Sequence, residues 1–286
     1  MSKKPPQPTA PITGEDLRRY LDTQDDFALE LEAYRHALGF GFKASHGGLY
    51  DDAKTNKRRQ YDVRASHEWG NMKLDLTIEC KSLDPAYPLL VQRVSRPGNE
   101  SFHQTMLSRG STTSYGTARE PQGWVGASLF KMSGTHLYDP QEQVGKSLKR
   151  VKLSENGFSA TDSDIYEKYT QALTSMDELV QSAAVEMRPE RAQIYSRAFL
   201  PIVLVSDGAL WVADYSASGQ LVADPRPEAD ETTFYLGWNY ELPNPFDIHP
   251  ATFTISHLHI MTRRRLPQFL SEVHTGGSIW YQLFGG

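Results

Sequence analysis

Residues 61–81 contain two stretches in which apolar and polar side chains alternate, which is typical of strands with one buried face. In the second stretch the alternation runs without a break from Leu74 to Lys81. We expect the two stretches to pair as a hairpin with its turn at 67–71, which brings Asp62 to the polar face of the second strand. That polar face carries Asp75, Thr77, Glu79 and Lys81, and the apolar face carries Leu74, Leu76, Ile78 and Cys80.

Glu79 and Lys81 are two residues apart, so their side chains should leave the same face roughly 6.5 Å apart along the strand. With Asp62 they form a group of two carboxylates and one ammonium. Carboxylate oxygens suit Mg²⁺ or Mn²⁺, and a metal held beside a phosphate polarises it and activates water. A lysine can orient that water or stabilise charge on the phosphorus. The alternative is that the three are ordinary charges on a solvated strand face.

A helix is expected over residues 15–38, where apolar residues recur at helical spacing. Glu30 lies at the edge of the apolar stripe, and a carboxylate at the rim of a buried face needs a partner. That partner is either the metal site or a basic side chain, Arg35 or Lys43. The apolar stripe consists of Phe27, Leu31, Tyr34 and Leu38.

The remaining segments favour a mixed α/β sheet flanked by helices. Residues 1–14 are rich in proline and are interpreted as a disordered tail, and residues 15–286 as a single domain. Residues 95–137 lack clear periodicity and are interpreted as a long insertion. The other expected elements are a short basic helix over 141–153, a long helix over 162–187, a hairpin over 200–215 with its turn at Asp207 and Gly208, a strand over 251–261 and a helix over 266–273.

The run from Phe27 to Lys81 resembles the PD-(D/E)xK nuclease superfamily, the restriction-endonuclease-like proteins. The matching pieces are the acidic helix FALELEAYRHALGF, the segment YDDAKTNKRRQYDVRA and the strand LTIECKSL, in that order. The resemblance continues more weakly through DPQEQVGKSLKRV, IYEKYTQAL and PIVLVSDGALWVADY. Tyr61 stands where the motif has the proline that names it, a position that varies widely in the family.

This resemblance implies a restriction-endonuclease-like α/β fold and a Mg²⁺-dependent endonuclease, with Mn²⁺ able to substitute. It implies that Asp62, Glu79 and the main-chain carbonyl of Cys80 bind the metal, that Lys81 positions the attacking water and that Glu30 supports the site. DNA is the expected substrate. Restriction or defence against phage is the expected setting, with a second copy of the chain or a protein of the defence system as a partner.

Charge is distributed unevenly along the chain, which has a formal net charge of −5. Two basic runs, over 54–64 and 143–152, fall beside the expected site, and basic residues in such positions can contact phosphates. The alternative is ordinary solvated charge on a loop and a helix. The residues expected to contact nucleic acid are Arg58, Arg59, Lys146, Lys149 and Arg150, the last three spaced to share a helix face.

A single cysteine cannot form an internal disulfide, so a reducing compartment, the cytoplasm, is expected. The most apolar stretch, 199–212, is interrupted by polar residues and falls short of a bilayer span, so no membrane association is expected.

Two other functions fit the same residues. The chain could be a non-catalytic nucleic-acid-binding or assembly subunit that keeps the nuclease fold, or a nuclease that processes structured RNA. His257 and His259 alternate on one expected strand in the manner of two zinc ligands. With no third ligand near them in sequence, a paired surface or core histidine is favoured.

Overall fold

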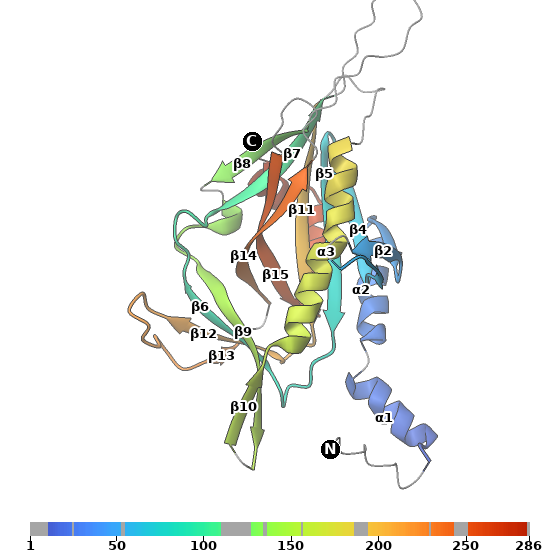
Figure 1. Cartoon of the computed structure of the whole chain (residues 1–286), viewed down its shortest axis with the longest axis vertical. Coiled ribbons are helices and arrows are strands. Elements are labelled where there is room, and N and C mark those ends of the chain that lie inside the picture. Colours follow the sequence, from blue (N-terminus) through green and yellow to red (C-terminus); the bar gives the residue numbers. More distant parts are fainter. Residues whose placement is uncertain are drawn as a thin grey trace, which may run out of the picture.

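The computed structural model describes residues 11–24, 26–52, 55–109, 127–133, 136–155, 157–185, 194–228, 230–242 and 251–284. Within these ranges, most strands join one large mixed sheet and helices cover both of its faces (Figure 1). The expected class, a mixed α/β sheet flanked by helices, is confirmed. The first ten residues of the expected tail lie outside the described residues.

The sheet order is β1-β4-β5-β11-β15-β14-β9-β6-β12-β13, with β10 paired to β9, β7 to β11 and β8 to β7, while β2 and β3 form a separate pair. The helices are α1 (Gly14–Gln24), α2 (Phe27–Gly39), α3 (Ser163–Val185), α4 (Arg265–His274) and α5 (Ser278–Phe284), with a short 3-10 helix η1 (His136–Tyr138). The strands are β1 (Lys43–His46), β2 (Leu49–Asp52), β3 (Lys57–Gln60), β4 (Val63–Trp69), β5 (Met72–Lys81), β6 (Leu89–Ser95), β7 (Phe102–Arg109), β8 (Ala127–Ser133), β9 (Gln143–Ser154), β10 (Gly157–Thr161), β11 (Ile194–Val205), β12 (Leu210–Tyr215), β13 (Arg226–Pro227), β14 (Glu231–Leu242) and β15 (Ala251–Thr262).

The expected hairpin of residues 61–81 is confirmed. Strand β4 pairs with β5 in antiparallel register, with Val63 opposite Ile78. On its other side β5 pairs in parallel with β11, which in turn pairs in parallel with β15. Val205 at the end of β11 lies beside both Lys81 and Thr262, so the three parallel strands end at one edge of the sheet.

Two side-chain hydrogen bonds connect the loops that leave this edge. The amide of Leu83 donates to Oγ of Ser206 at 3.0 Å, and the amide of Arg264 donates to Oδ1 of Asp207 at 3.0 Å. The loop after β11 is therefore bonded both to the loop after β5 and to the start of α4.

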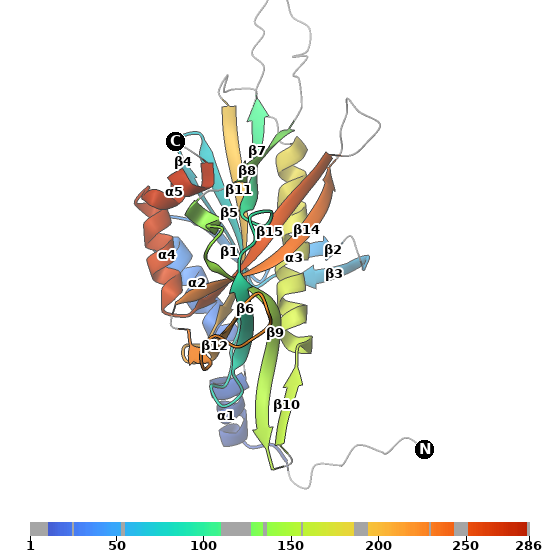
Figure 2. The same ribbon diagram turned by 90° about the vertical axis from the view of Figure 1, so that its left-hand side faces the viewer.

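Helices α2, α4 and α5 cover one face of the central strands, and α3 covers the other (Figure 2). The alternation of side chains along β5 determines which residues point to each face of the sheet. Cys80 and Ile78 are fully buried in an apolar cluster with α2 and α4, as the sequence predicted. Thr77 points the other way, and its hydroxyl donates to the Ala172 carbonyl of α3 at 3.0 Å.

We expect Cys80→Ser to lower the free energy of unfolding by about 1–3 kcal/mol, because it places a hydroxyl in this apolar cluster. Cys80→Ala is the matched control, since it removes the sulfur without adding a polar group. Urea unfolding of both variants measures the difference. Equal stability of the two variants would contradict the assignment of Cys80 to the apolar face.

The expected helix over 15–38 is two helices, the first ending at Gln24 and the second beginning at Phe27. The predicted apolar stripe is wrong as well, because Phe27 and Leu38 are 52% and 46% exposed. The buried face of α2 consists of Leu29, Ala33 and Ala37. These two alanines are fully buried, and their small side chains let the helix backbone approach the sheet closely.

The expected basic helix over 141–153 is also wrong, since these residues form most of strand β9. The spacing of Val144 and Leu148 fits a helix and a strand equally well, and both side chains are buried in a strand that pairs with β6. Gly145 lies where β9 meets β14. A Cβ atom on this glycine would stand 2.8 Å from the Val91 side chain and 2.9 Å from that of Phe234.

The expected hairpin over 200–215 does not form, although a turn at Gly208 is present with φ 75°. Strand β11 pairs with β5, β15 and β7, whereas β12 pairs with β6 and β13. The unbroken apolar run of β11 is typical of a central parallel strand buried on both faces. The other expected elements, over 162–187, 251–261 and 266–273, are confirmed within a few residues as α3, β15 and α4.

The expected insertion over 95–137 is only partly irregular. It contains β7 and β8, which pair with each other, and β7 also pairs with the start of β11. These strands therefore extend the main sheet, while residues 110–126 lie outside the described residues. None of the helices in the described part of the chain combines the length and the apolar character of a membrane span.

Candidate functional site

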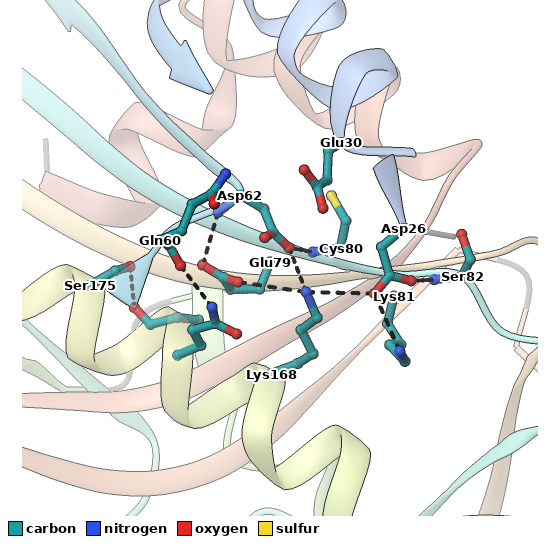
Figure 3. Close-up of polar contacts among 12 residues, drawn as sticks. Asp26, Glu30, Gln60, Asp62, Glu79, Cys80, Lys81, Ser82, Lys168 and Ser175 are labelled. Carbon is teal, nitrogen blue, oxygen red and sulfur yellow. Dashed lines mark hydrogen bonds and ion pairs between the residues drawn. The ribbon is translucent and has the colours of Figure 1, made fainter. Parts of the chain in front are cut away.

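Asp62 and Glu79 meet where β4 begins beside β5. Oδ2 of Asp62 accepts a hydrogen bond from the amide of Cys80 at 2.8 Å, and the amide of Asp62 lies 3.4 Å from Oε1 of Glu79 (Figure 3). Glu79 is fully buried and Asp62 is 6% exposed. The alternative of solvated charges on a strand face is therefore wrong for these two carboxylates, which lie beneath α3.

Lys168 of α3 brings a positive charge to the two carboxylates. Its Nζ lies 2.8 Å from Oδ2 of Asp62 and 4.0 Å from Oε2 of Glu79. Lys168 is not among the site residues predicted from the sequence. The available signal is its place on the helix, because a lysine three residues after Ile165 and four before Ala172 lies on the face that these buried residues define.

Asp26, also missed, joins Lys168 to Lys81. Its Oδ2 lies 3.3 Å from Nζ of Lys81 and 3.7 Å from Nζ of Lys168, and its Oδ1 accepts from the amide of Ser82 at 2.6 Å (Figure 3). Asp26 immediately precedes α2, yet its side chain makes no capping hydrogen bond to that helix. Its carboxylate is directed to the end of β5 instead, where it holds Lys81.

Glu30 faces the same site from α2 (Figure 3). Its partner is neither of the basic side chains considered from the sequence, Arg35 or Lys43, but His46 of β1. Oε2 of Glu30 lies 3.0 Å from Nε2 of His46, and the two side chains are 13% and 18% exposed. His46 was missed because it comes from a glycine-rich segment with no motif of its own.

Burial and mutual repulsion act on the acids of this site. Burial raises the pKa of Glu79 well above its ordinary value, and the neighbouring charge of Asp62 raises it further. The same two causes raise the pKa of Glu30. Burial alone would lower the pKa of Lys168, but the hydrogen bond to Asp62 and the charges of Asp62, Glu79 and Asp26 together outweigh it and hold that pKa above its ordinary value.

The donor set fits a hard divalent cation. When all of these groups are ionised, the site has a net charge of two negative units. The groups counted are the carboxylates of Asp26, Glu30, Asp62 and Glu79 and the ammonium groups of Lys81 and Lys168. Oε2 of Glu79 is buried and has no hydrogen-bond partner among the described residues. Among the described residues, no group of three or more His, Cys, Asp or Glu side chains is arranged to hold a metal. Asp62 and Glu79 would thus bind a metal as a pair, completed by water or main-chain oxygen.

The five residues expected to contact nucleic acid lie on two strands, Arg58 and Arg59 on β3 and the others on β9. Because β9 is a strand, the predicted shared helix face does not exist. Arg58 and Lys149 are exposed. The remaining three pair with acids: Arg59 with Asp52 at 2.8 Å, Arg150 with Asp164 at 3.0 Å, and Lys146 with Glu100.

A cleft of about 430 Å³ opens beside Lys81. Its walls come from the loop after β5, from the hairpin of β9 and β10, and from the beginning of α3. The cations in its lining are Lys81, Arg150 and Lys152, and the anions are Asp84 and Asp164.

The two histidines considered as zinc ligands form part of the core. His257 and His259 are 1% and 3% exposed. The ring of His257 stacks on Tyr138 with 3.8 Å between centroids, and Nε2 of His259 lies 2.9 Å from the hydroxyl of Tyr138. Burial lowers the pKa of His257 to about 2 and that of His259 to about 4, so both are neutral near pH 7.

Comparisons of the chain with protein-family models, with curated proteins and with solved structures give no match.

Proposed function

We propose that this protein is a metal-dependent endonuclease of the restriction-endonuclease-like class that hydrolyses phosphodiester bonds, with DNA as the favoured substrate. The observation that carries the proposal is the pairing of Asp62 with Glu79 in a buried, acid-rich site whose opening holds Lys81. A role in restriction or phage defence and a cytoplasmic location belong to the same proposal, and they rest on the sequence resemblance and the single cysteine.

Asp62 and Glu79 would hold Mg²⁺ or Mn²⁺, with the main-chain carbonyl of Cys80 as a third oxygen. The bound metal would polarise the phosphate and lower the pKa of the attacking water. Lys81 would orient that water and stabilise charge on the phosphorus. Asp26 positions Lys81 through their 3.3 Å ion pair and through its bond to the next amide in the chain. Glu30, paired with His46, would support the site.

The direct test is incubation of the protein with supercoiled plasmid DNA and, separately, with a structured RNA. Mg²⁺ and Mn²⁺ should support cleavage, and Ca²⁺ should support binding with poor cleavage because its looser coordination misplaces the water. Cleavage in EDTA would contradict the metal mechanism. Nucleic acid that is bound but left intact under every metal condition would instead favour the non-catalytic binding subunit, and cleavage of the RNA alone would favour the RNA-processing nuclease.

The exposed cations give a separate test of nucleic-acid binding. We expect Arg58→Ala combined with Lys149→Ala to weaken DNA binding for every sequence and to reduce the salt slope by about two units, one for each lost phosphate contact. Fluorescence anisotropy in Ca²⁺ at several salt concentrations measures this slope. The control is Lys43→Ala, because Lys43 is exposed on the edge strand β1. An unchanged slope in the double variant would assign both residues to ordinary solvated charge.

A further inference from the structure

The ammonium of Lys168 stands among three carboxylates of the candidate site. Its Nζ is 2.8 Å from Asp62, 3.7 Å from Asp26 and 4.0 Å from Glu79 (Figure 3). Two of these acids are the residues that would hold a divalent cation. Lys168 therefore supplies positive charge at the position where the metal would supply it.

We propose that Lys168 is an internal counter-ion that a divalent cation must replace. In the free protein Lys168 neutralises Asp62 and holds it beside Glu79. When a cation binds these carboxylates, the ammonium of Lys168 leaves Asp62. This inference rests on the proposed function, because it assumes that Asp62 and Glu79 bind a metal.

The replacement follows from the crowding of positive charge at Asp62. Oδ2 of Asp62 already accepts from the Cys80 amide and from Lys168, both at 2.8 Å. A divalent cation at the same carboxylate would stand close to the ammonium, and like charges at that separation in a buried site repel strongly. The side chain of Lys168 has a flexible four-carbon stem and is 15% exposed, so it can move toward the opening.

The displaced ammonium of Lys168 would be available to a substrate phosphate at the opening of the site. Asp26, at 3.7 Å, already pairs with Lys81, so Lys168 would bring a second positive charge to the place where a substrate phosphate must enter. Metal and phosphate would then favour each other, since the phosphate pairs with the charge that the metal displaces. In the absence of nucleic acid, metal binding should be weak because Lys168 competes with it.

The test is Mn²⁺ binding to the nucleic-acid-free protein by isothermal titration calorimetry. We expect Lys168→Met to bind Mn²⁺ at least about ten-fold more tightly than the wild type, and Lys168→Arg, which keeps the charge, to remain weak. Lys152→Met is the control, because Lys152 is an exposed lysine lining the neighbouring cleft. Asp62→Asn combined with Lys168→Met should bind no Mn²⁺.

Thermal unfolding gives a second measurement, which does not depend on a calorimetric binding signal. Without metal, Lys168→Met and the milder Lys168→Gln should melt below the wild type, because Asp62 and Glu79 lose their partner. Mn²⁺ should raise the melting temperature of both variants more than that of the wild type. Equal or weaker Mn²⁺ affinity in Lys168→Met, with clear binding to the wild type, would overturn this inference alone. Absence of Mn²⁺ binding to every protein tested would overturn the proposed function as well.

Discussion

Asp62→Asn and Glu79→Gln should each reduce the rate of DNA cleavage at least about a thousand-fold, which corresponds to about 4 kcal/mol of transition-state stabilisation. Both changes remove the negative charge that would hold the metal and preserve the shape of the side chain. Asparagine also keeps an acceptor for the amide of Cys80. Cleavage is measured by plasmid nicking in Mg²⁺ at matched protein concentrations.

The choice of variant follows from burial. Alanine at position 62 would leave the charge of Lys168 and the Cys80 amide without their 2.8 Å partner, so lost activity could reflect local damage. The control is Asp224→Asn, since Asp224 is exposed and lies in the loop between β12 and β13. Near-normal cleavage by either site variant, with cooperative melting intact, would remove Asp62 and Glu79 from the catalytic assignment.

Acid should destabilise this protein steeply between pH 6.5 and pH 4, because of His257 and His259. Both stay neutral in the folded protein, where burial holds their pKa values near 2 and 4, but both take up protons in the unfolded chain near pH 6.5. The unfolded state therefore binds more protons in this window, and stability falls as the pH falls. Two such protons correspond to a slope of up to about 2.7 kcal/mol per pH unit.

A double variant, His257→Gln with His259→Gln, isolates this contribution. We expect its free energy of unfolding, measured in urea at several pH values, to change less steeply with pH than that of the wild type. Glu30 and Glu79 act in the opposite direction, since their raised pKa values favour the folded state as pH falls, but they are present in both proteins. His36→Gln, on the partly exposed side of α2, serves as the control. Identical slopes in the double variant and the wild type would contradict the assignment.

The part of the site that lies on β4 and β5 could be predicted from sequence. A period of two places Glu79 and Cys80 on opposite faces whatever surrounds the strand, so their environments follow once the strand is recognised. The hairpin register then brings Asp62 opposite Glu79 through purely local pairing. Neither step depends on contacts between distant segments.

The missed residues depend on how distant elements pack. Lys168 reaches Asp62 across 106 residues of sequence, and Asp26 reaches Lys81 across 55. Helical spacing marks Lys168 as facing inward, but it does not specify which strands the helix covers. Strand β9 was wrongly predicted as a helix. The spacing of Val144 and Leu148 fits the helical period and the strand period alike, and only the pairing with β6 distinguishes the two.

The turn at Asp207 and Gly208 connects the segments that leave the sheet beside the opening of the candidate site. Ser206 and Asp207 bond to the loop after β5 and to the start of α4, while Lys81 lies only two residues before the bonded amide of Leu83. The loop that follows Lys81 is therefore anchored by a turn that contributes no side chain to the candidate site. We expect substitutions at Ser206 or Asp207 to loosen this edge of the sheet at a small cost in global stability, while the central strands keep their pairing.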